Sequence, residues 1–260
     1  MTFMNAWLAL RAGGCGVVVG FALALVGGGG SILAVPLLLY VVGVRDPHRA
    51  IGTSALAVSF NAFANLLPHA RLGHVYWRAA ATFALAGVCG AWLGSTLGKA
   101  VDGRRLLALF ALLMLVVAGF MLRGRRGDGV DRYPLPWSGP RLLGTGLVAG
   151  MLAGFFGIGG GFLIVPGLML AGGMDILHAI GTSLFAVGAF GLTAAINYAL
   201  SGLIDWPLAA AFIAGGVAGG WLGAAAATRL GRRRGALQMV FAAVIVMVAL
   251  YMLARAASGR

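Results

Sequence analysis

Two short segments of this chain carry chemically versatile side chains, and their sequences are the same. His48 precedes I-G-T-S at 51–54, and His178 precedes I-G-T-S at 180–183. The hydroxyls can donate and accept hydrogen bonds, and histidine changes its charge near neutral pH, so the pattern predicts contacts to a polar ligand and a proton-coupling or gating role for the histidines. Helix capping is an equally good interpretation of the hydroxyls, because each Thr-Ser pair follows a glycine near the start of an apolar run. A surface or structural role is the alternative for the histidines.

A glycine-rich cassette precedes each of these segments. Residues 27–36 read G-G-G-G-S-I-L-A-V-P and residues 157–166 read G-I-G-G-G-F-L-I-V-P, an offset of 130 at the first glycine (157 − 27) and at the proline (166 − 36). The offset becomes 129 at Gly52 and Gly181 (181 − 52). Duplicated segments interrupted by glycine and proline at corresponding positions are typical of a transporter site between two repeats. The alternative is that the glycines only allow helices to pack closely.

The composition indicates a membrane protein. Hydrophobic residues make up 61% of the chain and charged residues 10%, whereas soluble domains carry about 25% charged residues. The formal net charge is +13, and nearly all the basic residues lie in short connections between apolar runs. Membrane topology and anionic lipid head groups favour such a distribution, so we do not predict nucleic acid as a partner.

The apolar runs that contain the cassettes have an unusual length. Residues 12–44 and 142–174 are free of charge over 33 residues each (44 − 12 + 1 and 174 − 142 + 1). Two full spans need roughly 40 residues, so we expect one span and a short helix, broken at the glycines and with Pro36 or Pro166 about a turn into the short helix. Broken backbone is tolerated at membrane depth only where it is buried in protein or lines a cavity, and the amides that start a half-helix favour an anion.

The predicted fold is an all-α polytopic membrane protein. It has two homologous repeats of four or five transmembrane segments, eight to ten in total, and each repeat contains a Gly/Pro-broken helix. Residues 1–122 form the first repeat, 123–141 a basic linker and 142–260 the second repeat. Five segments per repeat make the copies inverted and four make them parallel, and the basic residues do not decide between them. We expect the inverted arrangement, because half-helices that meet from opposite sides make one shared site.

Together, the paired cassettes, histidines and I-G-T-S segments resemble the TauE/SafE family of sulfite and organosulfonate exporters, from about Gly13 to Leu253. The resemblance implies a transporter for sulfite, sulfonates or related small anions. It also implies a role for Asn197 and Tyr198, which look like the Asn-Tyr pair of the family. The first repeat has no such pair, so Asn61 or Asn65 could supply the polar contacts there.

The candidate substrate-binding residues are Gly28, Gly29, Gly30, Thr53, Ser54, Asn61, Gly159, Gly160, Gly161, Thr182, Ser183, Asn197 and Tyr198. The candidates for proton coupling or gating are His48 and His178, with Asp46 and Asp175 nearby.

The sequence thus predicts a secondary transporter that exports sulfite, an organosulfonate or a related small anion across the bacterial cytoplasmic membrane, with the anion bound between the broken helices near the bilayer midplane. A transporter of an unrelated anion, such as a carboxylate, and a non-transporting membrane scaffold are the alternatives.

No catalytic constellation, metal-ligand cluster or phosphate loop is present in the sequence, so we predict no enzymatic activity, metal or cofactor. The expected partners are the small anion, protons and membrane lipids. The oligomeric state stays open, with a homodimer as one option.

Overall fold

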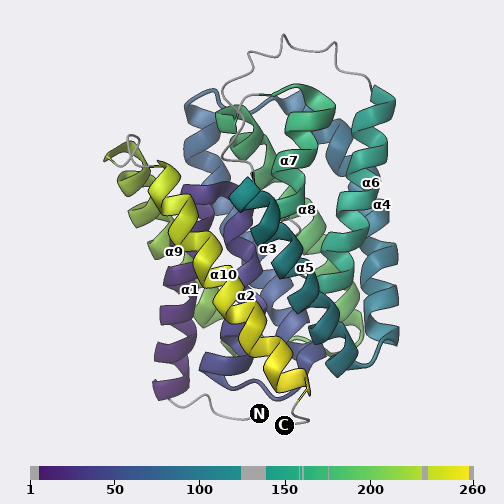
Figure 1. Ribbon diagram of the computed structural model, residues 1–260, viewed down its shortest axis with the longest axis vertical. Coiled ribbons are helices and arrows are strands. Elements are labelled where there is room, and N and C mark those ends of the chain that lie inside the picture. Colours follow the sequence, from purple (N-terminus) through teal and green to yellow (C-terminus); the bar gives the residue numbers. More distant parts are fainter. Residues whose placement is uncertain are drawn as a thin grey trace.

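Every residue that the computed structural model describes lies in a helix or a connecting turn (Figure 1). The described residues are 6–123, 139–157, 159, 161–174, 176–229 and 234–257. Within them the helices are α1 (Ala6–Val26), η1 (Gly27–Leu33), α2 (Ala34–Pro36), η2 (Leu37–Val42), α3 (Pro47–Arg71), α4 (Trp77–Ala100), α5 (Gly103–Arg123), α6 (Gly139–Phe156), α7 (Gly161–Gly172), α8 (Ile176–Leu200), α9 (Trp206–Arg229) and α10 (Arg234–Ala257).

Six of the described helices are long and apolar enough to cross a membrane. The qualifying stretches are Ala6–Ala24, Pro47–Arg71, Trp77–Ala100, Gly139–Phe156, His178–Leu200 and Trp206–Gly223, in α1, α3, α4, α6, α8 and α9. The other helical segments of the described chain are α5, α10 and the short helices that follow α1 and α6. The predicted all-α, polytopic membrane fold is confirmed. The total of eight to ten segments and the repeat organisation stay predictions.

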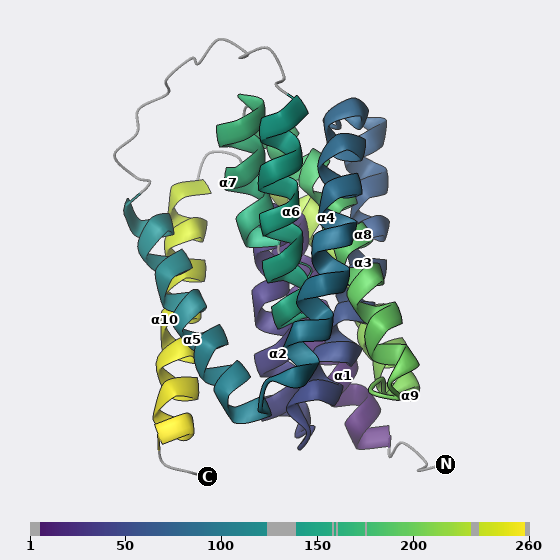
Figure 2. The same ribbon diagram turned by 90° about the vertical axis from the view of Figure 1, so that its right-hand side faces the viewer.

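The broken segments enter the bundle from opposite ends. α1 begins and α10 ends at one end of the molecule, and α5 ends and α6 begins at the other (Figures 1 and 2). The segment from η1 to η2 returns to the end at which α1 begins, whereas α7 returns to the end at which α6 begins. α5 and α10 pack against each other along one side of the bundle (Figure 2).

The centre of the bundle is formed by α3 and α8. Their spanning stretches are 78% and 67% buried, against 39–44% for the other four. The two helices pack along each other, and Ser59 Oγ of α3 donates a hydrogen bond to the carbonyl of Gly188 in α8 at 2.7 Å. α1 packs along α9, and α4 packs along α6, on either side of this centre.

Glycines allow these outer pairs to approach closely. A Cβ on Gly20 of α1 would collide with the backbone of Gly216 in α9, and a Cβ on Gly150 of α6 would collide with the backbone of Gly87 in α4. The two contacts are counterparts at the offsets seen in the sequence, since 150 − 20 is 130 and 216 − 87 is 129. Small residues at such crossings gain close van der Waals packing, which is the main attraction between helices in lipid.

The two cassettes break in different ways. Gly27–Gly30 are helical, as the first residues of the 3-10 helix η1, and the polypeptide continues through α2 into the π-helix η2, which ends at Gly43 with φ of 90°. In the second cassette Gly157 and Gly159 have φ of 63° and 65°, which favours glycine. The second cassette therefore uses the positive φ angles that glycine allows, whereas the first cassette changes its helix type.

Candidate functional site

The two cassettes come together between α3 and α8. α7 packs against η1, and η1 also contacts α8. Gly157 lies against Ile51 of α3, and Gly159 lies against Val58 of α3 and Val187 of α8. We call this place the junction, defined by η1, the start of α7 and these five residues. It brings two sequence-related segments, which enter from opposite ends, into one buried position.

Most of the predicted cassette glycines lie at or beside the junction. Gly28, Gly29 and Gly30 belong to η1, and Gly161 begins α7, whereas Gly160 lies outside the described residues. A Cβ on Gly30 would meet the backbone of α1, so this glycine allows η1 to fold closely onto the preceding helix.

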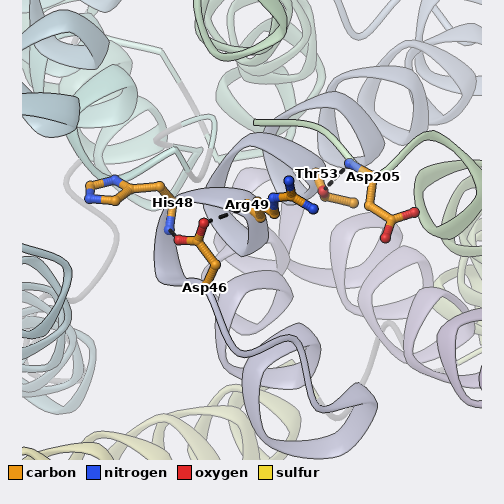
Figure 3. Close-up of polar contacts among 5 residues, drawn as sticks. All are labelled: Asp46, His48, Arg49, Thr53 and Asp205. Carbon is orange, nitrogen blue, oxygen red and sulfur yellow. Dashed lines mark hydrogen bonds and ion pairs between the residues drawn. The ribbon is translucent and has the colours of Figure 1, made fainter. Parts of the chain in front are cut away.

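The two threonines make equivalent contacts. Thr53 Oγ1 accepts a hydrogen bond from the N–H of Asp205 at 3.0 Å (Figure 3), and Thr182 Oγ1 accepts one from the N–H of Tyr76 at 3.1 Å. Asp205 directly precedes α9, and Tyr76 directly precedes α4. Each hydroxyl thus caps the start of a helix in the other half of the chain, and it retains its own proton for donation.

The two serines, by contrast, use their protons within the protein. Ser54 Oγ donates to the carbonyl of Ile51 at 2.9 Å and lies 3.2 Å from the carbonyl of Gly157. Ser183 Oγ donates to the carbonyl of Ile180 at 2.7 Å. A hydroxyl carries one proton, so these serines are poorly suited to donate to an anion. Ser54 instead ties α3 to the junction.

The glycines of the two I-G-T-S segments allow close contact with the opposite half. A Cβ on Gly52 would collide with the carbonyl oxygen of Leu203, and a Cβ on Gly181 would collide with that of His74. Gly52 also lies against Tyr198, whose side chain is fully buried and whose hydroxyl has no hydrogen-bond partner. The turns after α8 and α3 therefore rest directly on α3 and α8.

Asn61 has an uncommon environment for a polar side chain. It is fully buried on α3, and neither its Nδ2 nor its Oδ1 atom has a hydrogen-bond partner. Its amide lies against Gly216 of α9. Asn61 lies about one helical turn beyond Val58, which is one of the residues that define the junction. The neighbouring Asn65 differs, because its Nδ2 donates to the Asn61 carbonyl at 2.9 Å.

The amide of Asn197 is fully engaged. Its Nδ2 donates to Ser95 Oγ at 2.7 Å and Thr96 Oγ1 at 2.8 Å, while its Oδ1 accepts from Lys99 Nζ at 2.6 Å. Lys99 also donates to the Asn197 carbonyl at 3.1 Å and to Ser201 Oγ at 2.8 Å. This polar network ties α4 to α8. Lys99, the single lysine of the chain, was not among the site residues predicted from the sequence.

His48 lies apart from the other histidines of the chain. Its backbone N–H donates to Asp46 Oδ1 at 2.9 Å, as part of the cap of α3, and Arg49 lies 3.9 Å from the same carboxylate. The imidazole points away from Asp46 and from the Thr53–Asp205 contact (Figure 3). Its buried Nδ1 has no hydrogen-bond partner.

His178 belongs to a cluster of three histidines. Its ring stacks on Tyr76 at 4.5 Å and meets His74 edge-on at 5.7 Å, and His74 lies 6.1 Å from His69. Asp175, proposed from the sequence as a neighbour, lies outside the described residues. His69 and His74 were not predicted as site residues, although they bracket the turn after α3, which corresponds to the turn after α8. No metal-binding group of His, Cys, Asp or Glu is present within the described part of the chain.

These features define an all-helical, multi-pass membrane protein in which two broken helical segments meet between α3 and α8. The sequence profile described as "Sulfite exporter TauE/SafE" matches residues 12–252, and the chain belongs to this family. The protein is a membrane transporter of the bacterial inner membrane.

Relatives carry matching names. The chain is 53% identical over 249 residues to a "Probable membrane transporter protein" of Xylella fastidiosa strain Temecula1, covering 93% of this chain and 94% of the relative. It is 27% identical over 232 residues to the "Probable membrane transporter protein YunE" of Bacillus subtilis, covering 81% and 85%. A "Probable membrane transporter protein" of Haemophilus influenzae is 30% identical over 199 residues, covering 72% of each chain. No solved structure matches significantly.

Proposed function

We propose that this transporter is a secondary exporter of sulfite, an organosulfonate or a related small anion, and that the anion binds at the junction beside Asn61. The observation that carries the proposal is the buried amide of Asn61, which has neither donor nor acceptor satisfied. Leaving such a group unpaired costs about 1–3 kcal/mol, and a ligand that accepts from Nδ2 removes part of that cost. The description of the family as a sulfite exporter supports both the substrate class and the outward direction.

The junction can hold an anion without a buried countercharge. The side chains that define the junction are apolar, so any contacts to an anion come from neighbouring hydrogen-bond donors and not from cations. α7 begins at Gly161, so its first amides carry the partial positive charge of a helix N-terminus. Together with Asn61 Nδ2, these amides suit an oxyanion with several acceptor oxygens.

We further propose that residues 1–122 and 142–260 are inverted repeats joined by the linker 123–141. The contacts support this arrangement, because equivalent residues make equivalent contacts. The Thr53–Asp205 and Thr182–Tyr76 hydrogen bonds are related by an offset of 129 (182 − 53 and 205 − 76). Ser59 and Gly188 are counterparts at the same offset (188 − 59) and contact each other, as expected at an axis that relates two repeats.

Alternating access then has a simple structural basis. The Thr53–Asp205 contact closes the end at which α3 begins, and the Thr182–Tyr76 contact closes the end at which α8 begins. Opening one contact at a time would expose the junction to one side and keep it closed to the other. Each contact is a single hydrogen bond, worth about 0.5–1.5 kcal/mol, which a rocking motion can break.

Flux measurements in proteoliposomes test the proposed substrate. Wild-type protein and Asn61→Leu would be compared for transport of labelled sulfite, sulfate, an alkyl sulfonate and a small carboxylate. We expect saturable flux of sulfite or the sulfonate that the substitution abolishes. Flux confined to the carboxylate would contradict the substrate class, and absence of flux for every anion would favour a scaffold.

A further inference from the structure

A pocket lies away from the junction, at the end of the molecule where α1 begins and α10 ends. It has a volume of about 470 Å³ and is lined by residues near the end of η2, the beginning of α5 and the end of α10. Proteins bind small molecules in pockets of about 300–1,000 Å³. Pro47, which contributes to the wall, is the first residue of a candidate membrane span. The pocket therefore lies at the level at which the chain leaves the membrane.

Three arginines from three elements line this pocket. Arg45 follows η2, Arg104 lies in the first turn of α5, and Arg255 lies near the end of α10. The described lining residues include no Asp or Glu. The nearest carboxylates in the sequence, Asp46 and Asp102, cap α3 and α5 by accepting backbone N–H groups at 2.9 and 3.0 Å. Among the described side chains, three guanidinium groups and no carboxylate therefore line the wall.

The rest of the wall is largely apolar, with side chains that include Leu107 and Met252. Tyr40 adds an aromatic ring that meets the ring of Tyr251 edge-on at 5.1 Å. The guanidinium carbon of Arg255 lies 5.3 Å from the centroid of the Tyr40 ring, within the range of a cation–π interaction. Contacts between η2 and α10 thus position one of the three cations at the pocket.

We propose that this pocket binds the phosphate of an anionic phospholipid. Guanidinium groups pair with phosphate oxygens in a bidentate manner, and basic pockets between membrane helices suit such head groups. The apolar part of the wall favours a lipid over free phosphate. Exposed apolar side chains also occur on α5 and α10, among them Leu109, Leu112 and Leu250, and can contact acyl chains. The bound lipid would fasten the α5–α10 pair to η2, independently of the anion at the junction.

Lipid retention tests the proposal with the full-length protein. Wild type and the triple variant Arg45→Gln/Arg104→Gln/Arg255→Gln would be reconstituted in nanodiscs of phosphatidylcholine containing phosphatidylglycerol. The protein would then be extracted in mild detergent, and the retained lipid would be measured by native mass spectrometry. A matched control, Arg71→Gln/Arg78→Gln/Arg141→Gln, removes the same charge from exposed sites outside the pocket. The single variant Arg45→Gln changes an exposed loop residue and keeps the test valid if the triple variant fails to fold.

We expect the triple variant to retain at least about fivefold less phosphatidylglycerol than the control, and Arg45→Gln to show a smaller loss in the same direction. Equal retention by the control and the pocket variants would overturn the proposal. A parallel titration with soluble glycerol phosphate separates the two sources of phosphate. If the soluble anion binds with dependence on the three arginines while phosphatidylglycerol is not retained, a lipid is excluded as the occupant.

Discussion

The two I-G-T-S segments make the same backbone contacts but have different polar surroundings. In both, the glycine rests on a carbonyl of the opposite half, and the threonine accepts from an N–H at the start of α9 or α4. Around Tyr198, beside the first segment, a lysine joins Asn197 and Ser201. Around the second segment, three histidines gather instead. Backbone geometry is common to both ends, whereas a lysine network distinguishes one end and a histidine cluster the other.

The largest effect is expected where the two ends are alike. Gly52→Val and Gly181→Val place a side chain against the carbonyls of Leu203 and His74, so each variant should lose transport and about 1–3 kcal/mol of stability. Flux in proteoliposomes and thermal unfolding in detergent measure both quantities. Gly144→Val is the control, because no atom lies within 4 Å of a Cβ at that position. Wild-type behaviour of the first two variants would show that the close contacts are dispensable.

The next largest effect concerns the lysine network, which distinguishes one end. Lys99→Met removes hydrogen bonds to three oxygens and leaves the Asn197 Oδ1 acceptor without its charged donor. We expect a loss of about 1.5–3 kcal/mol of stability, the range for hydrogen bonds to a charged group. Lys99→Arg should recover only part of it, since a planar guanidinium cannot place three donors as an ammonium does. If Lys99→Met is as stable as wild type in thermal unfolding, the lysine network does not stabilise this end of the molecule.

The histidine cluster should make the other end sensitive to pH. Protonation within the cluster would place positive charges on rings separated by 5.7 and 6.1 Å, and their repulsion would loosen the turn on α8. Flux should change by about tenfold or less between about pH 5.5 and about pH 8.5. His74→Gln and His178→Gln should flatten this profile more than His48→Gln, because His48 is not part of the cluster. Equal profiles in all three variants would contradict a role for the cluster.

The smallest effect is expected at the threonines. Thr53→Val and Thr182→Val each remove one acceptor for a backbone N–H and should weaken closure of one end by about 1 kcal/mol. Hydrogen–deuterium exchange should rise at the N–H of Asp205 in the first variant and at the N–H of Tyr76 in the second. Exchange that rises at both ends in both variants would mean that the two ends do not open separately.

The sequence predicted the membrane class and the places at which helices break, because composition, charge-free length and glycine clusters are local properties. It also located residues that make equivalent contacts, such as Thr53 and Thr182, since duplication is visible as an offset. The sequence did not show that the two cassettes have different backbone conformations. Four consecutive glycines predicted a break in the helix, and at Gly27–Gly30 the α-helix gives way to the 3-10 helix η1, which packs onto α1.

Side-chain partners across the two halves could not be derived from the sequence. Asn197 was selected for substrate contact, but its hydrogen-bonding capacity is taken up by α4. The histidine cluster arises because the turn after α3 rests on α8, a contact between residues about 100 positions apart, such as His74 and His178 (178 − 74 = 104). Such contacts depend on helix packing, which a single sequence does not specify.

The central claim, that an anion binds at the junction beside Asn61, is tested most directly by measuring sulfite affinity and unfolding temperature of Asn61→Leu together. Leucine is similar in size and removes a buried amide without partners, so stability should be unchanged or higher, while affinity should fall by about tenfold or more. Asn65→Leu, which loses a hydrogen bond to the backbone, should lower stability and keep the affinity. Unchanged sulfite affinity in Asn61→Leu would contradict the account.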